Sequence, residues 1–433
     1  MMEHAPSVEP VASGSYPEFD VVVGSTVSLD RNVDGMRFPH ALGDAERRSL
    51  RLVLGAALRA CDFVVARPAE LEPSFKSMLA ERDLYARPYL LDDTNAVALS
   101  STRPVWATIN ASNHLSLHAF YPGLATAAAW NDVSAAEDAL LASSDSVRWA
   151  FDADLGYIMS EAGFCGTALA AKVMIHAPAL VMAGLAEMAF KRAMEAGFIV
   201  SGAYSGLAAS AGSLFELSLP AAYHDPERAA LARLDAAARA LAEYERRARE
   251  QLLHDSPWEL LDAIGRALGN AQGARLVSRD ESADIVSGLR LGIACGVLSG
   301  MDLAAAGELW ISMRMKPPAA EGGGDRSADN EPETAARARV LRHATANVVV
   351  VERYRDVQGS DKTRPAHIDH IGPGGGAPLP CGRTGPGTRA AGDTQGRRMH
   401  GLSHAGIAQD GYAGACHRPR AGGRRQEGWF PAR

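Results

Sequence analysis

Three stretches decide the fold of this chain: VWATINASNHLSL at residues 105–117, WAFDADLGYIMSEAGFCGTALAAKVMIHAPAL at 149–180, and SGAYSGLAASAGSLFELS at 201–218. The first predicts a strand from Val105 to Phe120, because apolar residues dominate it. The second ends in a helix that continues to about Ala196, with Gly197 as its C-cap. The residues alone therefore predict strands and helices without a topology.

The flanking segments add elements of both kinds. Phe19 to Ser28 predicts a buried strand. Ala45 to Ala60 predicts an amphipathic helix packed on a sheet, from apolar residues at helical spacing: Leu50, Leu52, Val53, Ala56 and Leu58.

A long helix after Pro220 begins with Asp225 as its expected N-cap and Pro226 in its first turn. Ser278 is expected to cap a later helix, with Glu281 as its capping-box partner.

Composition limits the possible functions. The chain has 433 residues, 47% of them apolar, and a net charge of −7. Residues 317–433 contain 17 Lys/Arg and 12 Asp/Glu, a balance of +5, so residues 1–316 sum to −12. An acidic body argues against nucleic acid and against an anion such as ATP being held by net charge. No stretch resembles a signal peptide or a membrane span, which predicts a cytoplasmic protein.

Single reactive side chains indicate no site. The five cysteines are scattered, without a C-x-x-C pair, so neither a disulfide framework nor a metal site is expected. Cys165 in an apolar run is expected to be a small core residue, and His114 a core histidine with its hydrogen bonds satisfied. Met174, Met182 and Met188 are expected to pack within the helix that follows.

Four blocks of sequence, in order, resemble the ATP:guanidino phosphotransferases, and in particular the bacterial protein-arginine kinases of the McsB type. GSTVSLDRN at residues 24–32 is similar to the family's S-S-R-V-R-L-A-R-N, and NASNHLSL at 110–117 to N-E-E-D-H-L-R-I. Residues 150–180 resemble F-A-F-D-E-K-L-G-Y and S-C-P-T-N-x-G-T-G-x-R-A-S-V-M-L-H-L-P-A-L. Residues 201–215 resemble R-G-x-Y-G-E-x-S-E-A-x-G-x-x-F. From the residues alone, 24–32 is equally a core strand followed by a turn.

The resemblance assigns a nucleotide site by position. Its residues are Gly24, Ser25, Thr26, Val27, Ser28, Asp83, Ser116, Ala170, Ala171, Lys172, Val173, Met174, Ser201, Gly202, Ala203, Tyr204, Ser205 and Gly206. Five of these positions carry arginine in the family: Thr26, Ser28, Ser116, Ala170 and Ser201.

The positions of the family's catalytic acids are altered as well. Ala111 and Ser112 replace two glutamates, Asn113 an aspartate, Gly206 and Ala209 two further glutamates, and Glu161 a cysteine. A methyl or a hydroxyl group cannot accept a proton at neutral pH as a carboxylate can. No catalytic residue is therefore expected.

Magnitudes support that expectation. A hydrogen bond to a charged group contributes about 1.5–3 kcal/mol, and one arginine can change a phosphoryl-transfer rate by ~10³–10⁵. The loss of five arginines nominally exceeds the roughly 8 kcal/mol of a micromolar complex. Lys172, Glu161 and Asp83 could form a different site, although their spacing does not require one.

A second signature lies near the C-terminal end. Residues 267–298 resemble the family's A-L-x-S-A-R-x-L-S-x-x-E-A-x-x-L-L-S-D-L-R-L-G-I-x-x-G-L. The regulatory phosphoarginine pocket of form R-D-x-x-R-A is matched only by Arg337 and Ala338 in its last two letters. An intact pocket is not expected.

The resemblance covers residues 18–345 and implies an α+β fold: an antiparallel sheet flanked by helices, as in the creatine and arginine kinases, followed by an all-α domain. The expected division is a flexible N-terminus at 1–17, a catalytic-type domain at 18–225, a helical domain at 226–345 and a disordered Gly/Arg-rich tail at 346–433, with a polar linker at 317–331.

Two functions remain open at this stage. One is a catalytically inactive pseudokinase without cofactor, a scaffold or regulator for the stress-response protease system that the family serves, with a homodimer as its suggested assembly. The other is an active kinase that transfers the γ-phosphate of Mg-ATP to arginine side chains of proteins. The missing charges favour the first.

Overall fold

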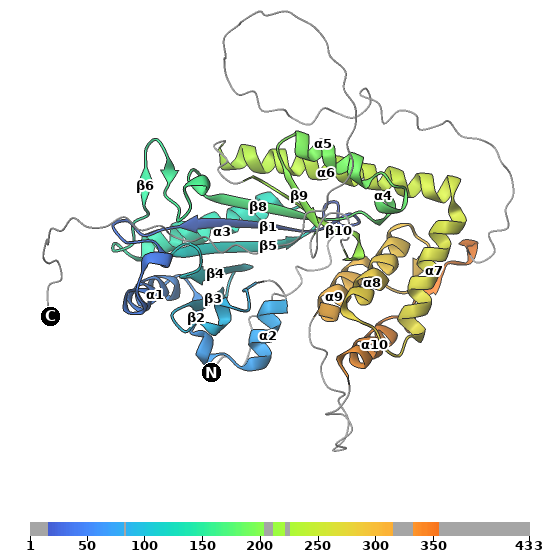
Figure 1. The fold of residues 1–433 in the computed structure, drawn as a ribbon, viewed down its shortest axis with the longest axis horizontal. Coiled ribbons are helices and arrows are strands. Elements are labelled where there is room, and N and C mark those ends of the chain that lie inside the picture. Colours follow the sequence, from blue (N-terminus) through green and yellow to red (C-terminus); the bar gives the residue numbers. More distant parts are fainter. Residues whose placement is uncertain (1–15, 82–83, 203–210, 221–225, 315–331, 355–433) are drawn as a thin grey trace, which may run out of the picture. The chain divides into compact units, whose positions relative to one another are not determined.

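The computed structural model describes residues 16–81, 84–202, 211–220, 226–314 and 332–354 (Figure 1). The expected linker at 317–331 and the tail after residue 354 lie outside these ranges, as does nearly all of the expected N-terminal segment. No helix in the described part is both long enough and apolar enough to cross a membrane.

The centre of the fold is an eight-stranded antiparallel sheet (Figure 1). Its strand order is β2-β3-β4-β5-β1-β8-β10-β9, so β1 lies in the middle, between β5 and β8. The strands are β1 (Val22–Arg31), β2 (Phe63–Ala66), β3 (Ala96–Ser100), β4 (Val105–Ile109), β5 (Leu115–Pro122), β8 (Leu169–His176), β9 (Ile199–Gly202) and β10 (Leu214–Ser218). Two short hairpins are β6 (Phe151–Asp152) with β7 (Gly156–Tyr157), and β11 (Leu298–Ser299) with β12 (Val349–Val350).

Helices cover one face of this sheet. Alternate strand residues such as Val27, Leu117 and Val173 are fully buried in one core with apolar side chains of these helices. The helices are α1 (Asp44–Arg59), α3 (Thr126–Ser143), α4 (Pro178–Met182), α5 (Ala186–Glu195) and α6 (Glu227–Asp255). The arrangement confirms the predicted α+β fold with its antiparallel sheet.

Two smaller cores complete the fold. Helix α2 (Pro73–Glu81) and the segment after it pack on β2, β3 and β4 through Leu79, Leu90 and Trp106. The second core joins the helices α7 (Pro257–Gly273), α8 (Arg279–Ala294), α9 (Leu303–Arg314) and α10 (Glu333–Ala344). Helix α6 buries its apolar side chains in the same core as the sheet, and the predicted domain boundary after residue 225 stays a prediction.

The predicted strand from Val105 to Phe120 is wrong in one respect, because the chain reverses within it. Strand β4 ends at Ile109, and Asn110 adopts a positive φ of 66°. Its side-chain amide donates to the carbonyl groups of Arg47 and Thr94, both at 2.9 Å. Asparagine tolerates this left-handed conformation. Asn110 therefore begins the turn at 110–114, although the apolar residues on both sides of it predict one continuous strand.

The predicted helix to Ala196 is also interrupted. It divides into α4 and α5 at Gly184, whose φ is 70°, and Gly197 ends α5 with a φ of 92°. In α1 the buried face is narrower than predicted, since Leu52 is 64% and Val53 42% exposed.

Of the two predicted N-caps, one is wrong and one is confirmed. The N-cap of α6 is Pro226 rather than Asp225, which lies outside the described residues. Ser278 caps α8 with Glu281, and both bonds of the capping box are present, as predicted.

Candidate functional site

The face of the sheet opposite α3 and α6 holds the positions that the sequence assigned to phosphate binding. We call it the site face, and it comprises Thr26, Ser28 and Asp30 on β1, Ser116 and His118 on β5, Ala170, Lys172 and Met174 on β8, Glu216 on β10 and Ser201 on β9. Strand residues alternate between faces, and the intervening residues of β1, β5 and β8 are buried under the helices.

The strand register brings four of the five altered arginine positions together. Ser28 lies opposite Ala170 on β8. On β5, the partner of Asp30 is Ser116. Thr26 lies on the same face as Ser28, two residues away. These four positions therefore form one contiguous patch of hydroxyl and methyl groups.

Other positional residues lie elsewhere or face the other way. Ser25, Val27, Ala171 and Val173 are buried beneath the helices, and the hydroxyl of Ser25 donates to the carbonyl of Gly123 at 2.7 Å. Their side chains cannot touch a ligand on the site face. Gly24 lies opposite Met174 on β8, while Ser201 belongs to the site face but lies outside the patch, on the edge strand β9 with Gly202. Asp83, Ala203, Tyr204, Ser205, Gly206 and Ala209 lie outside the described residues.

Few charges lie on the site face. Lys172 Nζ donates to Glu216 Oε2 at 2.9 Å, so its charge is already paired. His118 stacks on Trp106 with ring centroids 5.2 Å apart. Burial, together with the charge of Lys172, lowers the pKa of His118 to about 4, so this imidazole is neutral at pH 7.

Asp30 is a residue of the site face that the sequence pattern does not indicate as part of a site. Burial raises the pKa of its carboxyl group, while hydrogen bonds from Ser116 and Asn113 and the charge of Arg31 act in the opposite direction. The quoted family pattern has alanine at this position, and that single departure was the available signal. The site face thus contains an added carboxylate beside the positions that lack arginine.

The turn at 110–114, where the family's acids would lie, forms a hydrogen-bond network of its own. Asn113 Oδ1 accepts from Asn32 Nδ2 at 2.8 Å, from the Ser160 amide at 3.1 Å and from the Ser160 hydroxyl at 3.0 Å. Ala111 is half-buried and Ser112 is exposed. Neither offers an ionisable group to a substrate.

His114 is a buried histidine with both ring nitrogens engaged, as predicted. Nδ1 accepts from the Val33 amide at 2.9 Å, so Nε2 carries the proton and donates to the Arg37 carbonyl at 2.8 Å. Burial lowers its pKa. This imidazole has no free lone pair with which to act as a base.

Arg31 is fully buried beside the site face and serves the scaffold. Its guanidinium forms two bonds to Glu137 on α3, at 2.5 and 3.0 Å, and stacks 3.5 Å from the centre of the Tyr157 ring. It is therefore committed to joining β1 to α3.

Other predicted residues occupy less central places. Cys165 is only half-buried, and its Sγ accepts from the Met159 amide at 3.3 Å, so the prediction of a core cysteine is wrong. Glu161 is exposed ahead of a 3₁₀ turn at Ala162–Phe164.

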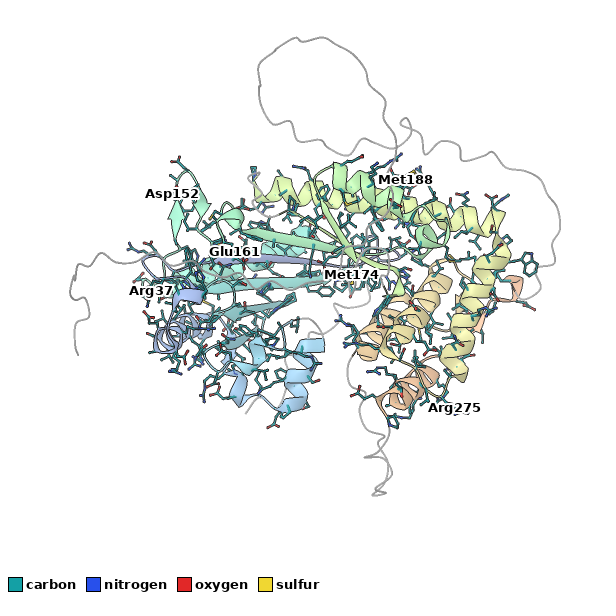
Figure 2. All side chains as sticks on the ribbon, in the orientation of Figure 1. Arg37, Asp152, Glu161, Met174, Met188 and Arg275 are labelled. Atoms are coloured by element: carbon teal, nitrogen blue, oxygen red, sulfur yellow. The ribbon has the colours of Figure 1, made fainter. Side chains whose placement is uncertain are left out.

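The prediction that the three methionines lie in one helix is wrong. Figure 2 shows Met174 on the sheet and Met188 on the helix above it. Met182 and Met188 are each 39% exposed, so they do not pack in a core.

The described residues do not fit a Mg-ATP polyphosphate. The donors on the site face are hydroxyl groups, the nearby ammonium is paired, and a carboxylate lies among them. No group of three metal-ligating side chains occurs within the described ranges. A hollow of about 430 Å³ lies between the C-terminal end of α1, β2 and α3, lined by Cys61, Phe63 and Arg103 among others, and no positional residue contributes to it.

Comparison with known proteins gives two family matches. Residues 63–248 match the model described as "ATP:guanido phosphotransferase, C-terminal catalytic domain". Residues 257–353 match "Protein-arginine kinase McsB C-terminal domain".

Curated whole proteins agree with these matches. The protein-arginine kinase of Symbiobacterium thermophilum is 30% identical over 309 residues, which cover 70% of this chain and 87% of the relative. That of Moorella thermoacetica is 29% identical over 309 residues, covering 70% and 87%. A lombricine kinase structure is similar with a TM-score of 0.47 at 16% identity, over 56% of this chain and 70% of that one.

Proposed function

Because this chain belongs to the protein-arginine kinase family of the ATP:guanido phosphotransferases, we propose that it is a family member without kinase activity. Its role would be that of a scaffold or regulator in cytoplasmic protein quality control. The family's reaction is phosphoryl transfer to the guanidino group of arginine.

One observation carries the proposal. Thr26, Ser28, Ser116 and Ala170 lie together on the site face, and none of them bears a positive charge. Phosphoryl transfer depends on positive groups placed around the phosphates. Hydroxyl and methyl groups cannot replace them, and the pairing of Lys172 with Glu216 removes the nearest ammonium from that task.

The proposed scaffold role is supported by what the chain retains. The sheet, the capping box of α8 and the buried Arg31–Glu137 pair are present, and they stabilise a surface that a protein partner could bind. Proteins of the stress-response protease system are the proposed partners, and a homodimer is the proposed assembly. Affinity capture of such a protease component and light scattering of the purified chain test these two points.

The alternative is an active protein-arginine kinase, which the names of the relatives favour. In that case Mg-ATP would be the cofactor and protein arginine the acceptor. Such an enzyme would need positive groups from residues outside the described ranges.

Calorimetric titration of the full chain with Mg-ATP separates the two functions, and it does not require knowledge of the substrate. We expect no heat of binding up to millimolar ATP. The Bacillus subtilis protein-arginine kinase, a relative with 28% identity, serves as the positive control. Saturable binding at micromolar concentrations would contradict the proposal and support the kinase.

A further inference from the structure

Asp30 lies on the site face, among the positions that carry arginine in the family. It extends from β1 toward the same side as Ser28, and its strand partner on β5 is Ser116. Its amide donates to the carbonyl of Ala168, two residues before Ala170. The carboxylate therefore lies between two positions from which the family's arginines would extend.

The groups around Asp30 are arranged as donors to an anion. Ser116 is its strand partner on β5, and the side chains of Ser116 and Asn113 both act to lower the pKa of its carboxyl group, although burial outweighs them and raises it. Asn113 Oδ1 already accepts three hydrogen bonds, from Asn32 and Ser160, so its amide NH₂ is the part that faces Asp30. A hydroxyl and an amide that converge on a carboxylate are the kinds of donor that also bind phosphate oxygens.

From this arrangement we propose that Asp30 is a built-in anion, whose carboxylate occupies the phosphate position of the site face and excludes phosphate groups from it. Asp30 is then a specificity-determining residue, and the site is closed by an added negative charge as well as by lost positive ones. This inference rests on the proposed function, because it concerns how the same face rejects nucleotide.

The position of Asp30 has two consequences for a phosphate group that approaches the site face. A phosphate that approached Ser28 or Ser116 would meet a like charge in a partly buried setting, where charges are less screened than in water. The same phosphate would have to share the donors of Ser116 and Asn113 with the neighbouring Asp30 carboxyl group. Glu216, the other carboxylate of the site face, is neutralised by Lys172 and does not compete for this role.

The first test removes the carboxylate from the full chain. In Asp30→Ala the donors of Ser116 and Asn113 lose their partner, and inorganic phosphate should take its place. We expect the thermal midpoint of the variant to rise as phosphate replaces chloride at constant ionic strength. At a hundredfold excess over the dissociation constant, mass action shifts the folding equilibrium by about a hundredfold. The unaltered chain should show only the general stabilisation that phosphate gives through its exclusion from protein surfaces, and the rise in Asp30→Ala should exceed it.

Asp235→Ala is the matched control. Asp235 is also a partly buried carboxylate that accepts from a hydroxyl, that of Thr126 at 2.6 Å, but it lies on α6 and away from the site face. Its thermal midpoint should respond to phosphate as the unaltered chain does. Equal phosphate responses of Asp30→Ala and Asp235→Ala would overturn the proposal.

A second test does not depend on the folding of Asp30→Ala. One arginine is introduced by Ser28→Arg, and tripolyphosphate binding is compared with and without Asp30→Asn, which preserves the shape of the side chain. We expect the double variant to bind tripolyphosphate about tenfold more tightly, or better, because one like charge is removed. Equal affinities would show that Asp30 excludes nothing.

The two failures can be told apart. Binding of Mg-ATP by the natural chain would overturn the proposed function. If the natural chain does not bind Mg-ATP, and phosphate or tripolyphosphate binding by the variants does not depend on Asp30, the proposed function stands and only the built-in anion is refuted.

Discussion

Ala168 adopts a φ of 52° directly before β8, a left-handed conformation that an alanine side chain disfavours. The quoted family pattern has glycine here. We expect Ala168→Gly to raise the free energy of unfolding by about 0.5–1 kcal/mol, measured by urea denaturation. Ala170→Gly is the control: it lies in extended β8 and should lower the free energy instead. Changes of equal sign would contradict the strain.

His118 predicts an acid sensitivity. Its folded-state pKa of about 4 lies below the ordinary value of 6.5, so the unfolded chain binds more protons between these values. The corresponding stability is complete above pH 6.5 and is lost as pH falls toward 4. We expect His118→Phe to flatten the dependence of the unfolding free energy on pH across this window, by on the order of 3 kcal/mol at most. An unchanged slope, or a ring that titrates near 6.5 by NMR, would refute it.

At the scale of elements, the sequence predicts what local chemistry controls. Ser278 and Glu281 cap α8 through their own side chains, and the apolar spacing of α1 places the helix within one residue of its ends. The sequence does not reveal the turn at Asn110, because apolar residues continue on both sides of it.

The candidate site was predictable only as positions in a pattern. The cross-strand pairs of Ser28 with Ala170 and Asp30 with Ser116 depend on register, which forms between segments far apart in the chain. For this reason Asp30 was overlooked, and the buried Ser25, Val27, Ala171 and Val173 were included.

The connection between β10 and the helices α8 and α9 depends on one glycine. Gly212 has a φ of 69°, and its amide donates to Asp284 at 2.8 Å. An added Cβ would lie 2.6 Å from the Trp310 ring. We expect Gly212→Ala to lower the free energy of unfolding by about 2–4 kcal/mol, as strain and overpacking combine.

Gly35→Ala isolates the backbone part of that effect. Gly35 has a φ of 70° with no atom within 4 Å of the added Cβ, so its cost should be only about 1 kcal/mol. Equal losses in the two variants, measured by the same denaturation, would show that Trp310 does not constrain Gly212.

At the scale of the whole molecule, the segment before β1 links the sheet to the helices. Asp20 accepts from Arg246 and, at 3.1 Å, from Arg249 on α6, and the carbonyl of Phe19 accepts from Arg290 on α8. Burial raises the pKa of Asp20, but the hydrogen bond from Arg246 and the charges of both arginines outweigh it and lower the pKa.

Asp20→Asn tests this link. We expect a loss of about 2 kcal/mol in the free energy of unfolding at pH 7, because two arginines each lose one carboxylate partner, while Arg246 keeps Glu18 and Arg249 keeps Glu245. The contribution of a carboxyl with a lowered pKa is present above its unfolded value of 3.8 and disappears as pH falls below it, so variant and natural chain should converge in acid. Asp255→Asn, at the exposed end of α6, is the control that should change little.

The position of the site face also bears on how such a chain can diverge from its relatives. Its altered side chains lie on the side of the sheet away from the main core, so Thr26, Ser28 and Ala170 can vary without disturbing the packing under α3 and α6. Genetic drift on such a face can erase a chemistry while folding selection keeps the architecture. Under the proposed function, a genome survey that counts enzymes by fold would record the chain as a kinase, and the side chains of the site face would be the feature that separates it from active relatives.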